Sequence, residues 1–169
     1  MERPIFKPVG TPVEQLDTPA LVVDVADLER DIDTLHSFFC QHNAKIRTYV
    51  ESHRCPAISH KQLAAGGTVG GICVGTLGQA EVFAEHGFTD ILVAREMVIP
   101  QKIGRLCALA RHARMTVAVD QPQNVQDLSN AASTRRVTLH VVGWLVTTVM
   151  AMNVMGTIRY GAEWWNFGP

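Results

Sequence analysis

The chain has 169 residues, of which 47% are apolar and 18% are charged, and its formal net charge is −1. This length fits one domain with a sizeable hydrophobic core, and the composition is typical of a soluble α/β protein. The 15 basic residues form neither a stripe nor an RNA-recognition motif, which argues against a nucleic-acid-binding protein.

Short apolar runs alternate with amphipathic stretches along most of the chain. Residues 1–18 come first and are predicted to form an arm, because three prolines remove backbone donors and disfavour helix. The predicted strands are 20–25, 45–51, 70–74, 90–94, 115–119 and 137–142. The predicted helices are 28–39, 56–65, 77–85, 100–110 and 122–132.

Local signals support the helices. Either Asp24 or Asp27 can cap the first helix, and Thr76 with Gln79 matches a capping box at the third. The inner face of the first helix is predicted to consist of Leu28, Ile32, Leu35 and Phe39.

The regular alternation predicts parallel strands covered by helices on their outer face. From residue 45 onward five strands follow one another at intervals of about 20–25 residues, which is the repeat of a (β/α) barrel. A complete barrel needs eight strands and usually about 250 residues, so we predict an α/β fold with a partial barrel of about five parallel strands. The predicted divisions are an arm 1–18, an incomplete barrel 19–142 and an atypical tail 143–169.

The tail differs in composition from the rest of the chain. It contains all three tryptophans, and residues 137–158 carry no formal charge over a length sufficient to span a bilayer. We favour a buried strand followed by an irregular tail over a membrane helix, because the stretch contains polar residues. They include His140, Thr147, Thr148 and Asn153.

The four cysteines are not spaced as a Cys-x-x-Cys pair, so neither a zinc site nor a disulfide framework is predicted. They are Cys40, Cys55, Cys73 and Cys107. We expect reduced, mostly buried thiols in a cytoplasmic protein, and no metal site. Residues 1–17 lack the apolar region of a secretory signal.

Several motifs match one known family in order and spacing. They are LDTPALVVD at 16–24, RTYVESHRCP at 47–56, GIC at 71–73, LGQAE at 77–81 and DILVA at 90–94. Over residues 14–142 the chain resembles the D-threonine aldolase and D-serine dehydratase family. These are pyridoxal-phosphate (PLP) enzymes with an alanine-racemase-like amino-terminal barrel.

The resemblance implies a fold, a cofactor and a reaction. In the family a lysine at the end of the first barrel strand forms a Schiff base with PLP, which serves as an electron sink for cleavage of a D-amino acid such as D-threonine or D-serine. Many members also use a divalent metal held near the carboxyl terminus. The implied partners are a small D-amino acid and a second copy or a full-length relative.

The chain departs from this pattern at the position that matters most. Arg47 and His53 match the family motif, but the Schiff-base lysine falls on Glu51. A carboxylate cannot condense with an aldehyde, and the guanidinium of Arg54 stays protonated. Thr76 and Gln79 stand where the family often has lysine and glutamate. After residue 142 the family's phosphate-binding loops and metal ligands are not found, so the chain is predicted to be truncated.

Each candidate residue has a functional and a simpler interpretation. His53 either orients a cofactor or is merely exposed at a strand–helix junction, and Arg47 either binds an anion such as a phosphate or is a solvated base. Glu51 is either a general acid or base whose pKa burial has raised, or a lost lysine without a new role; we favour the second. Arg95 and Glu96 are predicted to form a local ion pair. We expect five other histidines at helix surfaces or ends: His36, His42, His60, His86 and His112.

The sequence therefore predicts a relative of the PLP-dependent D-amino-acid lyases that is inactive as this chain, a pseudoenzyme. The competing hypothesis is a non-catalytic binding or regulatory protein that pairs with a full-length relative, since an open barrel edge exposes unpaired strands. A third is a truncated product without a stable fold.

Overall fold

The computed structural model describes residues 7–147 and 150–158, with side-chain surroundings described for residues 7–143. Its α-helices are α1 (Val25–Gln41), α2 (Pro56–Ala64), α3 (Leu77–Glu85), α4 (Pro100–Leu109) and α5 (Pro122–Arg135). Its strands are β1 (Ile46–Tyr49), β2 (Thr68–Val74), β3 (Asp90–Val93), β4 (Arg114–Val119), β5 (Leu139–Thr147) and β6 (Met150–Ile158). Short 3-10 turns, η1 (Val13–Gln15) and η2 (Val50–Ser52), complete the described elements.

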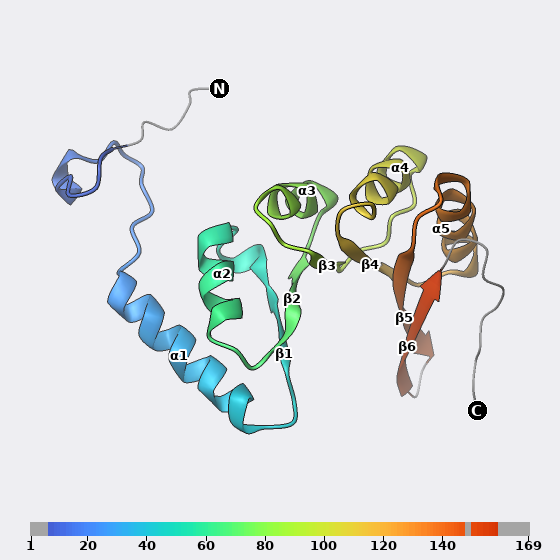
Figure 1. Ribbon diagram of the computed structural model, residues 1–169, viewed down its shortest axis with the longest axis horizontal. Helices are drawn as coiled ribbons and strands as arrows, with labels where there is room; N and C mark the ends of the chain where they lie inside the picture. Colours follow the sequence, from blue (N-terminus) through green and yellow to red (C-terminus); the bar gives the residue numbers. More distant parts are fainter. Residues whose placement is uncertain (1–6, 148–149, 159–169) are drawn as a thin grey trace.

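The strands form one six-stranded sheet in the order of the sequence, β1-β2-β3-β4-β5-β6. The first five are parallel, and β6 pairs antiparallel with β5. Helices α2 to α5 follow one side of the sheet, while α1 leads away from it toward the amino terminus (Figure 1). The predicted partial barrel of five parallel strands with outer helices is confirmed, and among the described residues the sheet is open, with β1 at one edge.

The hydrophobic core lies between the sheet and the helices. Alternate strand residues, such as Ile72 and Val74 on β2 and Ile91 and Val93 on β3, are fully buried. They pack in one cluster with helix residues such as Leu106. The intervening residues Val69 and Cys73 of β2 are less buried, as expected when only one face of a sheet is covered. The opposite face is therefore the one on which polar side chains are available.

Capping signals gave the helix starts correctly. Asp24 caps α1, where its Oδ1 accepts hydrogen bonds from the backbone N–H groups of Ala26 and Asp27. Both bonds of the capping box predicted for Thr76 and Gln79 are present at α3. A proline stands in the first turn of α2, α4 and α5, where its missing N–H leaves no bond unmade.

The strand predicted over 20–25 is wrong. Residues 20–24 form no strand, and Val25 already begins α1. The side chains of Leu21, Val22 and Val23 are 102%, 62% and 54% exposed. A β-branched run becomes a strand only beside a partner, and no described strand lies next to this one.

The inner face of α1 differs from the prediction by one position. Leu35 is 49% exposed, whereas His36, expected at the helix surface, is fully buried. The imidazole Nδ1 of His36 lies 2.6 Å from the carbonyl oxygen of Gly66, so the helix turns a histidine inward to meet a backbone acceptor. Hydrophobic periodicity alone gives no sign of such a contact.

The last described strands correct the prediction for the tail. Strand β5 continues to Thr147 instead of ending at 142, and β6 follows it as an antiparallel strand. The membrane-helix alternative for 137–158 is wrong, because this stretch forms β5 and β6. No helix within the described residues is long and apolar enough to cross a membrane. Residues 159–169 lie outside the described part, so the division at 143 stays a prediction.

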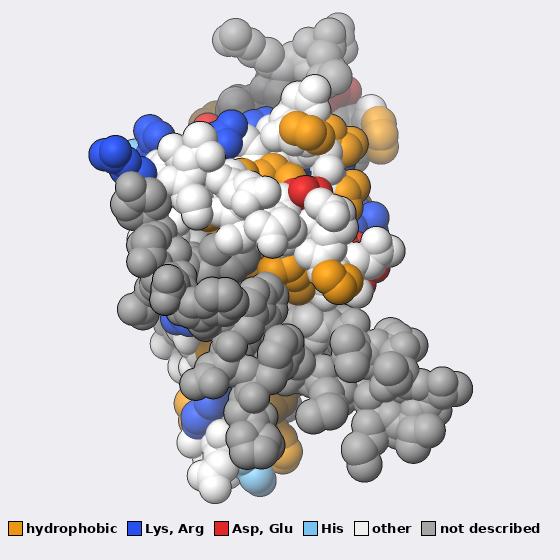
Figure 2. All heavy atoms as spheres, turned by 90° about the vertical axis from the view of Figure 1, so that its right-hand side faces the viewer, with side chains coloured by type: hydrophobic (Ala, Val, Ile, Leu, Met, Phe, Trp, Pro, Cys, Tyr) orange, Lys and Arg blue, Asp and Glu red, His pale blue; other side chains and the backbone are white. Residues whose placement is uncertain are grey.

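The cysteines are free, but they are not mostly buried as predicted. Only Cys107 is buried, Cys55 and Cys73 are half-buried, and Cys40 is exposed. Viewed from the β5–β6 side, the described surface mixes hydrophobic with polar side chains, and its basic groups appear in several separate places (Figure 2).

Candidate functional site at the end of β1

The first parallel strand carries the candidate residues on one face. Arg47 and Tyr49 of this strand, and Glu51 just after it, lie against the glycines of β2 and of the turn that follows β2. A Cβ atom added at Gly75 would sit 2.8 Å from both the Tyr49 hydroxyl and Glu51 Oε2, and one added at Gly71 would collide with the Arg47 guanidinium. The glycines therefore provide the room that these three side chains occupy.

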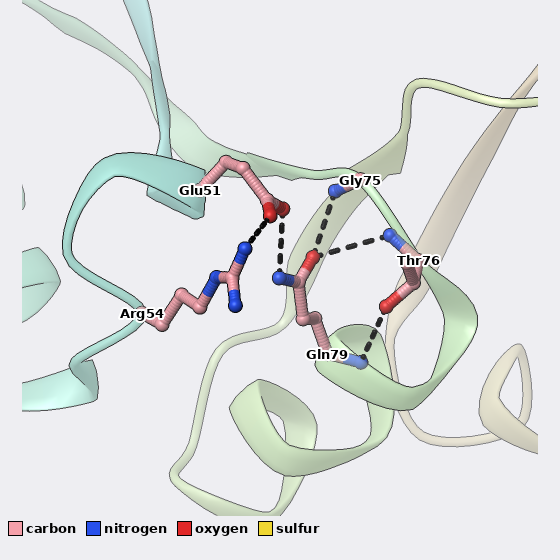
Figure 3. Close-up of polar contacts among 5 residues, drawn as sticks. All are labelled: Glu51, Arg54, Gly75, Thr76 and Gln79. Atoms are coloured by element: carbon pink, nitrogen blue, oxygen red, sulfur yellow. Dashed lines mark hydrogen bonds and ion pairs between the residues drawn. The ribbon is translucent and has the colours of Figure 1, made fainter.

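Glu51 was predicted to be the last residue of the strand. It lies instead in the 3-10 turn η2 that follows β1. Gln79 Nε2 donates a hydrogen bond of 2.8 Å to Glu51 Oε2, and the Arg54 guanidinium donates to Glu51 Oε1 (Figure 3). The Gln79 hydrogen bond, together with the charges of Arg54 and Arg95, lowers the pKa of Glu51 against the opposing effect of burial. The net shift is downward, contrary to the hypothesis of a raised pKa, and Glu51 is a carboxylate at neutral pH.

The orientation of the Gln79 amide follows from the start of α3. Its Oε1 accepts hydrogen bonds from the backbone N–H groups of Gly75 (2.9 Å) and Thr76 (3.1 Å). Thr76 Oγ1 in turn accepts from the backbone N–H of Gln79 at 3.2 Å. Because the amide oxygen is committed to these donors, the amide nitrogen must face Glu51 (Figure 3).

His53 ends η2 and is half-buried, so the simple interpretation as an exposed junction residue is wrong. Its Nδ1 accepts a hydrogen bond of 3.0 Å from the backbone N–H of Cys55, which leaves Nε2 as the protonated nitrogen of the neutral ring. Burial lowers the pKa of His53, and the facing side chain of Gln62 partly opposes that shift. The imidazole is neutral at pH 7, and its cofactor-orienting role stays a prediction.

Arg47 is not at the strand end with Glu51 and His53. Its guanidinium forms an ion pair of 2.8 Å with Asp90 Oδ1, and Arg114 lies 3.8 Å from Asp90 Oδ2. Asp90 and Arg114 are the first residues of β3 and β4, at the opposite end of the sheet. Gly71 faces Arg47 and Gly75 faces Glu51. These two glycines are four positions apart, which corresponds to about 13 Å along extended backbone. Arg47 is therefore no solvated base, and its predicted contact with an anion stays untested.

Two residues near Glu51 were missed or misread at the level of sequence. Gln79 was expected to cap the helix and to stand where the family often has glutamate, but its contact with Glu51 was not predicted. Arg95 forms no ion pair with Glu96, contrary to the prediction, and its charge acts on Glu51 instead. Among the described residues, no group of three or more His, Cys, Asp or Glu side chains is arranged to hold a metal ion.

No family model matches the chain. Individual proteins do. The chain is 35% identical over 122 residues to the D-threonine aldolase of an Arthrobacter species, and 36% identical over 124 residues to the 3-hydroxy-D-aspartate aldolase of Paracoccus denitrificans. It is 34% identical over 96 residues to the D-threo-3-hydroxyaspartate dehydratase of a Delftia species. The chain is a homologue of these D-amino-acid aldolases and dehydratases.

Solved structures agree with this relationship. The crystal structure of the D-threonine aldolase from Filomicrobium marinum superposes with a TM-score of 0.71 at 38% identity, over 75% of this chain and 34% of that one. An alanine racemase-like protein from Idiomarina loihiensis gives a TM-score of 0.68 at 22% identity, over 83% of this chain and 37% of that one, which supports the fold alone. The matches cover 72% and 73% of this chain but only 32% of each of the two aldolases, so the chain spans about a third of their length.

The residues of this aldolase homologue do not fit a covalent PLP site at the end of β1. Such a site needs a free amine, and position 51 holds a carboxylate with hydrogen bonds to Gln79 and Arg54. Of the four lysines in the sequence, Lys45 donates to the Phe39 carbonyl oxygen at 2.8 Å and Lys61 pairs with Glu29. The other two, Lys7 and Lys102, lie in the arm and on α4. None of the four lysines lies in β1 or in the turn η2 that carries Glu51.

Proposed function

We propose that this chain descends from a PLP-dependent lyase of D-3-hydroxy amino acids and does not itself form a Schiff base with PLP. It is then a non-catalytic relative, which acts by binding a partner. The observation that carries this proposal is the carboxylate of Glu51, which is held by Gln79 and Arg54 where the resemblance places the lysine. The substrate class, D-threonine or a related D-amino acid, rests on the names of the homologous aldolases.

A carboxylate in this setting has little chemistry left to offer. The hydrogen bond from Gln79 and the charges of Arg54 and Arg95 lower the pKa of Glu51, which makes it a weak base at neutral pH. Both of its oxygens already accept hydrogen bonds from neighbouring side chains. These contacts support a structural role for Glu51 and no role in proton transfer.

The direct test is an activity assay. The purified chain, incubated with PLP and D-threonine, is expected to release no acetaldehyde above the rate of PLP alone. A D-threonine aldolase measured in parallel shows that the assay detects the reaction. Release of acetaldehyde that scales with the concentration of the chain would contradict the proposal.

The unpaired edge of β1 favours a protein partner. Strand β1 pairs with β2 on one side and has no described strand on the other. The sheet face that carries Tyr49, which is 47% exposed, is not covered by the described helices. Exposed strand edges recruit further strands, so we propose a second copy or a longer relative as the partner. The four free thiols are consistent with a reducing, cytoplasmic location.

Light scattering coupled to size-exclusion chromatography tests the partner. We expect a defined dimer of the chain, or a defined complex with an added D-threonine aldolase, and we expect Tyr49→Lys to weaken either one by placing a charge on the uncovered face. Glu85→Lys, which introduces the same type of residue at an exposed position on α3, is the control. A monomer that ignores the aldolase would contradict this part of the proposal.

A further inference from the structure

Gln79 links the start of α3 to Glu51 through the two ends of its amide group. We propose that Gln79 and Glu51 form a matched donor–acceptor pair that joins the turn after β1 to the start of α3. In this pair the helix cap fixes the amide, and the amide in turn requires an acceptor at position 51. The inference rests on the proposed function only in identifying position 51 as the former lysine position.

The amide cannot simply rotate to suit another partner. Its oxygen accepts from the backbone N–H groups of both Gly75 and Thr76. A half-turn about the last side-chain bond would point its NH₂ group at these two donors and leave both without an acceptor. The first turn of α3 therefore holds the Nε2 donor toward Glu51.

The turn that carries Glu51 is equally constrained. Arg54 adopts a left-handed backbone conformation with φ of 51°, and its N–H donates to the Val50 carbonyl oxygen at 2.7 Å. The Cys55 N–H is bonded to His53 Nδ1. A non-glycine residue with positive φ persists where its surroundings determine it strongly. Residue 51 thus cannot easily move away from Gln79.

The positive charges around position 51 favour an acidic residue there. The guanidinium of Arg54 binds Glu51 directly, and the charge of Arg95 acts on it from the end of β3. A lysine at position 51 would face one amide donor and two positive charges, with no acceptor in return. Replacing Gln79 by glutamate would keep a carboxylate oxygen for the helix cap and turn the second group into an acceptor. Loss of the lysine at 51 and presence of glutamine at 79 are therefore coupled.

A double-mutant cycle on thermal unfolding tests this coupling. The proteins are the wild type, Glu51→Gln, Gln79→Glu and the double variant Glu51→Gln/Gln79→Glu, in which the two side chains exchange places. At pH 7 we expect Gln79→Glu to lower Tm, because two carboxylates then face each other. The exchanged pair, with its donor and acceptor reversed, should recover most of the lost Tm.

A second cycle uses Glu51→Lys with Gln79→Glu. Here Glu51→Lys alone should lower Tm, and adding Gln79→Glu should raise it again by supplying an ion pair. Glu85→Lys, at an exposed position on α3, controls for the change in net charge. Additive changes in Tm in both cycles would overturn the proposal. No PLP is present, so the outcome is independent of whether the wild type binds the cofactor.

Discussion

At the scale of single residues, the end of β1 brings together polar side chains with different surroundings. Glu51 is bonded to Gln79 and Arg54, and His53 accepts from the backbone of Cys55. The glutamate and the histidine both have lowered pKa values, for opposite reasons: stabilisation of the charged form in Glu51 and burial in His53. Both shifts make stability depend on pH, and the two act in different pH ranges.

Glu51 contributes to stability at neutral pH and loses that contribution in acid. Its pKa in the folded chain lies below the ordinary 4.5, so its stabilisation is complete above 4.5 and falls as pH drops through the folded value. We expect Glu51→Gln to unfold at a lower temperature than the wild type at pH 7, and the gap to narrow below about pH 4. A gap that is equal at both pH values would show that the carboxylate charge has no role.

His53 gives a second pH dependence at a higher pH. Its pKa is lowered from 6.5 by burial, so stability is lost as pH falls below 6.5, where the unfolded chain takes up a proton first. His53→Asn keeps an acceptor for the Cys55 N–H and removes the titration. Between pH 7 and pH 5 the Tm of this variant should therefore fall less than that of the wild type. If the Tm of both proteins falls equally between pH 7 and pH 5, the imidazole of His53 is not neutral and buried as described.

At the scale of elements, the parallel strands and their outer helices could be predicted from sequence because each signal is local. Two kinds of signal were sufficient to predict these elements: the capping residues at 24, 76 and 79, and the apolar runs at regular intervals. The failures were residues whose state depends on a distant partner. The run at 20–24 lacks a neighbouring strand, and His36 is buried by its contact with Gly66, thirty positions along the chain. Arg47 likewise pairs with Asp90, 43 residues away.

The glycines of β2 offer a test of this packing at the element scale. A methyl group at Gly71 would lie 2.6 Å from the Asp90 carbonyl oxygen, which is backbone and cannot move aside. We expect Gly71→Ala to destabilise the chain by about 1–3 kcal/mol through overpacking. Gly78→Ala, which has open space on α3, should instead stabilise it by about 0.5–1 kcal/mol. Chemical denaturation gives the change in the free energy of unfolding for both variants. Equal changes would contradict the described packing of Gly71 against Asp90.

At the scale of the whole molecule, the sheet has one face covered by helices and an uncovered face that ends at an unpaired β1. The sequence predicted this open arrangement from the count of strands, and it predicted separately that Glu51 stands at the family's lysine position. It gave no sign that Gln79 and Arg95 surround that glutamate, because both lie on other elements and meet it only in the fold. The consequence is a strand end that holds a hydrogen-bonded carboxylate and lacks a reactive amine.

The most direct measurement is reductive trapping. The chain is incubated with PLP, treated with borohydride and digested, and each lysine-containing peptide is examined by mass spectrometry. We expect no stoichiometric, saturable pyridoxyl adduct on any of the four lysines, because none lies at the end of β1. A single lysine labelled to completion at low PLP concentration, and left unlabelled when the chain is unfolded before PLP is added, would contradict the account.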